Sequence, residues 1–214
     1  MQKKVVNNKD EIPLKHYMEQ FAELDPAERA KELGLEYVND TFTVTMFGAT
    51  YQIHWPEATF SCDDERAIAM ISASGKIMLL RYLIGGKTIP TSGAYKTFRE
   101  LPWGEIYLQT FNGRCIMRLA YKFNGNKARF AEGAKALGGI PLEHGDAGFY
   151  FDFIGDYHLQ IFLWEADEEF PPNAQIEFSD NFALGFSAED AVVAAELLIS
   201  AISEKMKMVK IKEA

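Results

Sequence analysis

The first part of the chain has a helical pattern of apolar residues. From Pro13 to Leu24 these residues are three or four positions apart, as on one face of a helix. They are Leu14, Tyr17, Met18 and Phe21. Asp25-Pro26 predicts the start of a second helix, because Asp caps helix N-termini and Pro fits the first turn. Gly34 predicts its end.

The pattern changes to a period of two from residue 41. TFTVTMFGATYQIHW alternates in polarity and is broken once at Gly48, which predicts a β-hairpin. Acidic residues at 63–65 favour the start of a further helix, because they complement its dipole. That helix is expected to end at Gly85-Gly86. The connection over residues 85–104 is long for a plain linker.

Helices and strands are grouped separately in the second half. Helices are expected over Glu105–Phe123 and Asn126–Leu137. GFYFDFI and YHLQIFLWEA flank Gly155-Asp156, which predicts a hairpin, and AQIEFSD predicts another strand. Ser187 begins a capping-box pattern before a terminal helix.

This order of elements predicts an α+β fold with a mainly antiparallel sheet and helices packed on one face. We expect a single domain over residues 1–214. Within it, residues 1–40 form a small helical N-terminal section, and residues 41–214 form the sheet and its covering helices.

Composition narrows the functional classes. The 214 residues carry a formal net charge of −9, which argues against nucleic acid and against an anionic membrane surface as partners. The N-terminus has no apolar run of a secretory signal, and no stretch reaches the roughly 20 apolar residues of a membrane span. A cytoplasmic location is therefore expected. Cys62 and Cys115 are too few for a thiolate metal centre. Because no recognised metal-ligand signature occurs either, no metal site and no particular cofactor are predicted.

The segment 165–172, EADEEFPP, is the first candidate site. The carboxylates of Asp167, Glu168 and Glu169 would bind a cation, or one of them would act as a general acid or base. The alternative is a solvated acidic turn in which Asp167 caps backbone amides. Phe170 is expected to pack inward.

The Pro-containing loop over residues 95–104 is the second candidate. Arg99 and Lys96 would hold a ligand carboxylate or phosphate, and Phe98 and Trp103 would form the walls of the pocket. Arg81 and Tyr82 of the preceding helix would be further ligand contacts. The alternative is that Arg99 pairs with a structural carboxylate and the aromatic residues fill the core. In the functional interpretation this loop and the acidic segment face each other across a shared hollow.

The late hairpin supplies the remaining candidates. His144 lies near Asp146, and a His/Asp pair is suited to proton transfer. His144 is therefore a catalytic candidate, and Asp146 and Trp164 are ligand-binding candidates; the alternative is that these residues are structural. The aromatic strand residues would line an apolar pocket or fill the core.

Three stretches, taken together and in this order, resemble a known family. They are LLRYLIGGKTIPTSGAYKTFRELPWG, Gly138-Gly139 followed by Gly145-Asp146, and FLWEADEEFPPNAQIEFSDN before the terminal helix. Over roughly residues 15–205 the chain resembles the bacterial family catalogued as domain of unknown function 3786, found largely in anaerobes. The resemblance implies a cytoplasmic protein with no established reaction. Some relatives resemble fusions to a four-cysteine iron–sulfur module, which this chain lacks.

Three functional hypotheses follow. The first is an accessory protein of anaerobic metabolism that binds a small molecule, because no common catalytic signature occurs. The second is an enzyme in which Asp167, Glu168 or His144 acts as acid or base while Arg99 orients an anionic substrate. The third is an interaction module that docks a partner protein or a second copy in a homodimer.

Overall fold

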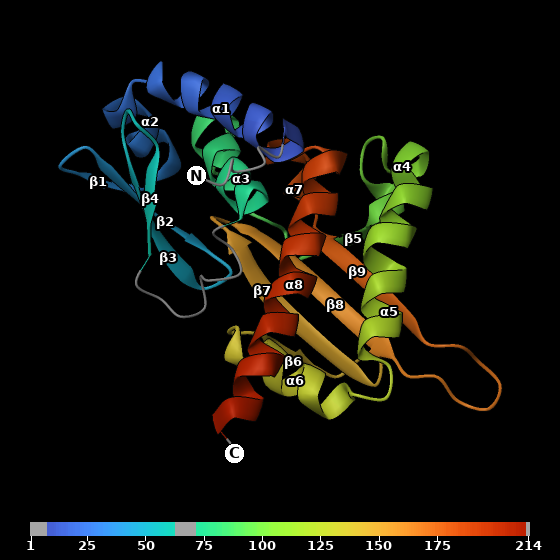
Figure 1. The fold of residues 1–214 in the computed structure, drawn as a ribbon. Helices are drawn as coiled ribbons and strands as arrows, with labels where there is room; N and C mark the ends of the chain where they lie inside the picture. Colours follow the sequence, from blue (N-terminus) through green and yellow to red (C-terminus); the bar gives the residue numbers. More distant parts are fainter. Residues whose placement is uncertain (1–7, 63–71, 213–214) are drawn as a thin grey trace.

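The computed structural model describes residues 8–62 and 72–212, which form an α+β fold (Figure 1). One nine-stranded antiparallel sheet runs through the described part of the chain, in the order β4-β3-β2-β7-β8-β9-β5. β1 pairs with β2, and β6 pairs with β7. The expected fold class is confirmed.

The N-terminal part combines helices with a small meander of strands. Its elements are α1 (Asn8–Ala22), α2 (Pro26–Leu33), β1 (Glu36–Val38), β2 (Thr41–Met46), β3 (Ala49–His54), β4 (Thr59–Ser61) and α3 (Ala73–Gly85). The Asp25 cap, the Gly34 stop and the hairpin around Gly48 are confirmed. The acidic start expected for the third helix lies outside the described residues. The division expected at residue 40 stays a prediction, although the β1–β2 pair extends across it.

The second part of the sheet is larger. It consists of β5 (Tyr95–Thr97), β6 (Ile140–Leu142), β7 (Ala147–Ile154), β8 (Tyr157–Trp164) and β9 (Asn173–Ser179). The predicted hairpin at Gly155-Asp156 and the predicted strand β9 are confirmed. The short strands β5 and β6 were not predicted.

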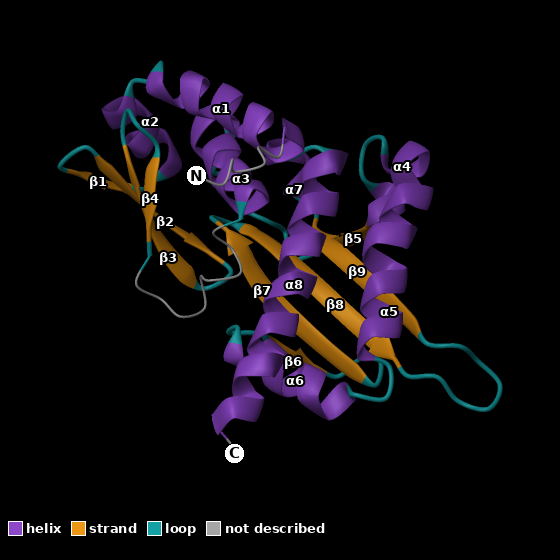
Figure 2. Cartoon of the chain, viewed as in Figure 1, coloured by secondary structure: helices purple, strands orange, loops and turns teal. Residues whose placement is uncertain are grey.

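Helices cover one face of β7, β8 and β9 (Figure 2). They are α4 (Gly104–Phe111), α5 (Met117–Phe123), α6 (Lys127–Ala136), α7 (Phe182–Gly185) and α8 (Ala188–Lys212), with the 3₁₀ turn η2 (Phe98–Glu100) and the π-helical turn η3 (Asn112–Ile116). The helix predicted over Glu105–Phe123 is continuous through η3. Ser187 accepts a hydrogen bond from the Asp190 N–H and so caps α8 as expected.

The core lies between this helical layer and the strands. Phe149, Phe151 and Phe153 of β7 are buried there, and α8 buries its apolar face from Ala191 to Ile202 against them. The other face of β7–β9 is not covered by helices in Figure 2. We call it the open face.

A β-bulge joins the two parts of the sheet and sets the composition of the open face. β2 meets β7 only at Met46 and Ile154, where the Phe47 N–H also donates to the Phe153 carbonyl at 2.8 Å. The β7–β8 register shifts at the same place, so that Asp152 rather than Phe153 stands opposite His158. Opposed residues in an antiparallel pair share a face, and the bulge therefore brings His158 to the open face beside Asp152.

Candidate functional site

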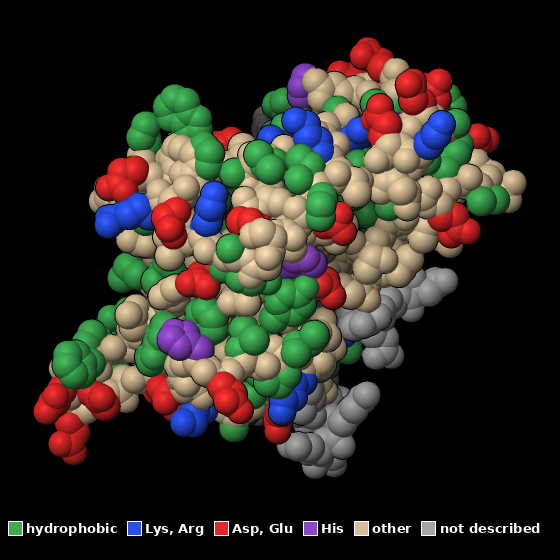
Figure 3. Space-filling model, turned by 180° about the vertical axis from the view of Figure 1, so that it is seen from behind, with side chains coloured by type: hydrophobic (Ala, Val, Ile, Leu, Met, Phe, Trp, Pro, Cys, Tyr) green, Lys and Arg blue, Asp and Glu red, His purple; other side chains and the backbone are tan. Residues whose placement is uncertain are grey.

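The open face carries polar and aromatic side chains from neighbouring strands. The register places Tyr150 opposite Gln160, Asp152 opposite His158, and Gln160 opposite Glu177. Figure 3 shows histidine and acidic side chains among hydrophobic ones on this side of the molecule. Residues from β7, β8 and β9 thus gather there although they are far apart in sequence.

Tyr150, Asp152 and His158 form a hydrogen-bonded cluster. The Tyr150 hydroxyl donates to Asp152 Oδ1. His158 Nδ1 lies 2.7 Å from the Tyr150 oxygen and 3.0 Å from Asp152 Oδ1. Because the tyrosine proton is already directed to Asp152, the geometry favours a proton on Nδ1 of His158.

Burial and this network also affect the tyrosine. Partial burial raises the pKa of Tyr150 well above its usual value, and the hydrogen bond to Asp152 and the negative charge of that carboxylate add to the effect. Tyr150 therefore remains a neutral donor at physiological pH, and Nε2 is the ring nitrogen of His158 that takes no part in the cluster. An imidazole oriented in this way can accept a proton or a hydrogen bond from a bound molecule.

A shallow hollow of about 390 Å³ lies on the same face. Its lining consists of Leu142, Glu143, His144, Gln160, Phe162 and Glu177, and we call it the acidic hollow. The His144 ring stands edge-on to Phe162, with centroids 4.7 Å apart, and to Trp164 at 5.5 Å. Gln175 donates to Glu177 Oε1, which orients the Glu177 carboxylate in the lining of the hollow.

Two glycines allow the His144 loop to lie close to the strands. A Cβ at Gly145 would stand 2.9 Å from the Leu163 carbonyl oxygen, and one at Gly148 would stand 2.7 Å from the His144 carbonyl oxygen. Asp146 adds a further contact to the end of β8, since its carboxylate accepts the Glu165 N–H at 2.8 Å. The side chains of this segment are therefore positioned by backbone contacts.

The electrostatic character of the open face is negative. The lining of the acidic hollow contains two carboxylates and no Lys or Arg. A second hollow of about 390 Å³, between the two parts of the sheet, contains Glu36 and Asp152 and again no Lys or Arg. Burial raises the pKa of Tyr95, and the charges of Asp152, Glu177 and Asp180 raise it further, although a hydrogen bond with Gln160 partly offsets this. Such a surface favours a cationic ligand.

Two of the predicted ligand contacts and one catalytic candidate lie at this face. His144 lines the acidic hollow, and Trp164 packs against it. Asp146 is nearby, but its carboxylate binds the backbone of Glu165. The structure thus brings His144 and Trp164 together and gives Asp146 a positioning role.

The predicted acidic residues lie elsewhere. Asp167, Glu168 and Glu169 are exposed in the β8–β9 loop, which extends past the end of the sheet in Figure 1. The Glu169 and Phe170 N–H groups donate to Asp167 and lower its pKa. This is the capped acidic turn of the alternative interpretation. The expectation that Phe170 packs inward is wrong, because its side chain is 66% exposed beyond the end of the sheet.

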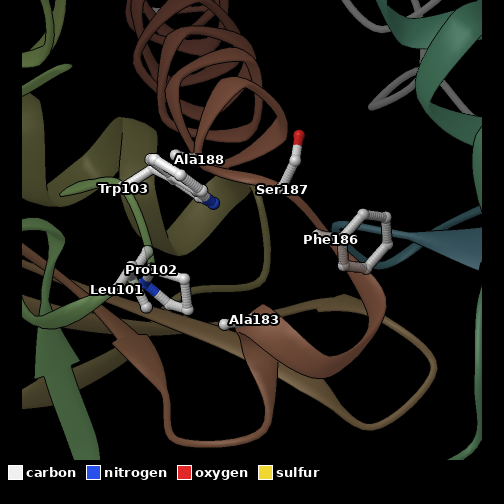
Figure 4. Close-up of a pocket in the computed structure, with 7 residues that line it drawn as sticks. All are labelled: Leu101, Pro102, Trp103, Ala183, Phe186, Ser187 and Ala188. Carbon is white, nitrogen blue, oxygen red and sulfur yellow. The ribbon is translucent and has the colours of Figure 1, made fainter. Parts of the chain in front are cut away.

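The Arg99 segment borders two other hollows. Phe98 is buried in a stack with Phe111, while Arg99 pairs with Glu105 at 2.9 Å. Both Phe98 and Arg99 line a groove of about 470 Å³ beside residues 173–176 of β9. Trp103 borders a hollow of about 230 Å³ at the start of α8 (Figure 4). Neither lining includes a residue of 165–172. The two segments predicted to face each other instead lie at opposite ends of the edge formed by residues 173–176.

Arg81 and Tyr82 make structural contacts. Arg81 pairs with the buried Asp190 carboxylate at 3.0 Å and lies over the Tyr17 ring. Tyr82 is buried and stacks with Phe186. Burial raises the pKa of Tyr82 to about 12. These two residues connect α3 to α1 and to the start of α8.

Sequence reasoning missed Asp152, Gln160 and Glu177 as site residues. Their signal is present, since each is the polar member of an alternating strand. Recognising that they share one face requires the register and the bulge at Phe153, neither of which a single strand pattern reveals.

The described part of the chain shows no sign of two other kinds of site. Among residues 8–62 and 72–212, no group of three or more His, Cys, Asp or Glu side chains is arranged to hold a metal ion. Over the same part of the chain, no helix has both the length and the apolar character needed to cross a membrane.

Comparison with known proteins identifies one family. No curated protein and no solved structure matches the chain. A family model described as "Domain of unknown function (DUF3786)" matches residues 25–201, a range that includes the whole sheet. The chain therefore belongs to this family of domains of unknown function.

Proposed function

We propose that the protein binds a small organic cation, such as an amine or a guanidinium compound, in the acidic hollow of the open face. The observation that carries the proposal is the lining of this hollow, in which Glu143 and Glu177 lie beside aromatic rings without a Lys or Arg to neutralise them. Carboxylates attract a cation, and aromatic faces add to the attraction. The function is then that of an accessory small-molecule-binding protein.

The role of each residue follows from its place in the hollow. Glu177 is the main anionic contact, because Gln175 engages only one of its carboxylate oxygens. Glu143 and His144 lie on the loop above, and the Phe162 ring forms an apolar wall. Gln160 supplies an amide group that orients a ligand hydroxyl or carbonyl. We further propose that the protein acts in the cytoplasm of an anaerobic bacterium, the location expected from its sequence.

The experiment is a binding titration with defined probes. Agmatine and putrescine are titrated by calorimetry, with glutarate as an anion of comparable length. We expect the two cations to bind and glutarate not to bind. Glu177→Gln should weaken cation binding roughly tenfold to a hundredfold, the effect of losing a hydrogen bond to a charged group. Glu132→Gln on α6 removes an equal charge away from the open face and should leave binding unchanged. Equal affinity for glutarate, or an unchanged affinity in Glu177→Gln, would exclude the proposal.

A second candidate function is proton transfer by His158. It is favoured by the Tyr150–Asp152–His158 cluster, which orients the imidazole and leaves Nε2 available. This version of the enzyme hypothesis uses His158 as the base and does not use Arg99, which lines a different hollow. Diethyl pyrocarbonate modification followed by peptide mass spectrometry tests the orientation. In the native protein, diethyl pyrocarbonate should modify His158 at Nε2. Asp152→Asn should change the rate of this modification, measured relative to the rate at the exposed His54.

A further inference from the structure

The edge of the sheet at β9 is paired over only part of its length. β5 pairs with Glu177, Phe178 and Ser179, and its ladder ends at Thr97. In the described part of the chain, no strand continues this ladder along residues 173–176. An unpaired edge presents backbone groups to which another strand can add.

The direction of the backbone groups can be worked out from the neighbouring contacts. The Asp180 N–H donates to the Ala94 carbonyl at 3.0 Å, toward the β5 side. Alternate residues of a strand point their N–H and C=O groups to the same side, so Ile176 and Ala174 also point toward this edge. The Ala174 N–H is bonded to the side chain of Asn173 at 2.8 Å rather than to another strand.

A groove runs along the same edge. Its volume is about 470 Å³, and one wall is formed by Leu108, Phe111, Ile116 and Met117 of α4, η3 and α5. Met117 is 55% exposed, so this wall presents apolar surface to solvent. A strand added at residues 173–176 would direct alternate side chains toward this wall, and apolar residues at those positions would bury it.

The two ends of the groove differ in charge, because Arg99 at one end is paired with Glu105, whereas the carboxylates near the other end are exposed. Thr97 and Arg99 lie at one end. The β8–β9 loop, with exposed Glu168 and Glu169, joins β9 at the other end. Four strand residues span about 13 Å. A segment that continues the direction of β5 would begin beside Thr97 and end beside this acidic loop.

We propose that the β9 edge binds an extended segment of a partner protein by antiparallel strand addition, with apolar residues at alternate positions and Lys or Arg at its C-terminal end. The basic end is required by charge complementarity with Glu168 and Glu169. The apolar residues are required by the wall of α4–α5, and the extended conformation by continuation of the β5 ladder. The linings of this groove and of the acidic hollow share no residue, although Gln175 of the groove donates to Glu177 of the hollow.

A random heptapeptide phage library is the probe. Selection on the full chain should enrich sequences with alternating apolar residues followed by Lys or Arg. The double substitution Glu168→Lys and Glu169→Lys should change the selected C-terminal residues to Asp or Glu, while Asp167 keeps the loop closed. A consensus without charge preference, or one that the reversal does not change, would overturn the proposal.

The enriched peptide is then measured by fluorescence polarisation. Met117→Glu should weaken binding roughly tenfold or more, because it places a charge in the apolar wall. Ile106→Glu is the matched control, since Ile106 is exposed on α4 but does not line the groove. Ala174→Pro should abolish binding, because it removes an N–H of the edge and leaves the β8 ladder intact. Circular dichroism checks that each variant is folded.

Amide hydrogen exchange locates the bound peptide. Protection of the Ala174 and Ile176 amides on peptide addition is the expected result. Protection confined to the open face would overturn the proposal. So would a concentration-dependent dimer of the free protein that protects the same amides, because the edge would then belong to a second copy.

Discussion

The stacked rings of Phe98 and Phe111 provide a quantitative test of how the Arg99 segment is held. Their centroids are 4.1 Å apart with an interplanar angle of 2°, and both side chains are buried against Phe178. Truncation of one buried Phe to Ala costs about 3–5 kcal/mol. The stack contributes about 0.5–1.5 kcal/mol beyond burial. Phe98→Ala and Phe111→Ala should therefore each lower the free energy of unfolding by about 3–5 kcal/mol.

The double variant distinguishes the stack from independent burial. Once one ring is absent, the other has already lost its stacking partner. The double variant Phe98→Ala/Phe111→Ala should therefore lose less unfolding free energy than the sum of the two single losses, by at least about 0.5–1.5 kcal/mol. Urea unfolding at neutral pH measures each loss, and thermal unfolding should show a Tm lowered by roughly 6–20 °C in each single variant. Ile106→Ala, at an exposed position of α4, should change stability by less than about 0.5 kcal/mol. Strictly additive losses, or a single loss below about 1 kcal/mol, would refute this account.

Three further predictions concern the turns and the thiols. Gly155→Ala should lower the free energy of unfolding in urea by roughly 1–3 kcal/mol, because Gly155 has φ +54° and a Cβ there would lie 2.5 Å from the Tyr82 hydroxyl oxygen. Adding Tyr82→Phe to this variant should recover part of the lost stability, and no recovery would contradict the steric explanation. Hydrogen bonds from Ser92 and Thr91 lower the pKa of Asp180 to about 2 from 3.8. Its carboxylate therefore stabilises the fold above about pH 4 and loses this effect as the pH falls through 2, so the stability difference from Asp180→Asn should shrink over that window; a difference independent of pH would contradict this. Burial raises the pKa of the Cys115 thiol to about 12. In a Cys62→Ser variant at pH 8, Cys115 should therefore resist alkylation by iodoacetamide in the native protein and react once urea unfolds the chain; mass spectrometry measures the alkylation.

The elements that could be predicted have signals contained within a few neighbouring residues. Asp25-Pro26, Gly34 and the Ser187 cap determine local helix ends through hydrogen bonds made within one turn. The Gly155-Asp156 turn is equally local. Long strands such as β7 and β8 show their alternation over enough residues to be recognised.

The elements that were missed depend on partners distant in sequence. β1, β4, β5 and β6 have three residues each, too few to display a period, and each is a strand only because a longer strand lies beside it. The position of Arg99 follows from this. β5 pairs with the end of β9, and that pairing, rather than any property of the loop sequence, brings Arg99 to the groove and away from the acidic loop.

The open face shows why the site is harder to predict than the fold. A regular hairpin around Gly155-Asp156 would place His158 opposite Phe153, on the face that packs against the helices. The bulge adds one residue to β7, so that His158 stands opposite Asp152 instead. Phe153 also accepts the hydrogen bond from Phe47 that joins the N-terminal part to the sheet. One irregular residue therefore both connects the two parts of the sheet and brings the imidazole next to Asp152. Its position follows from contacts with Phe47, more than 100 residues earlier in the chain. For this reason the alternation within β7 and β8 predicts two strands correctly but does not predict which of their side chains meet.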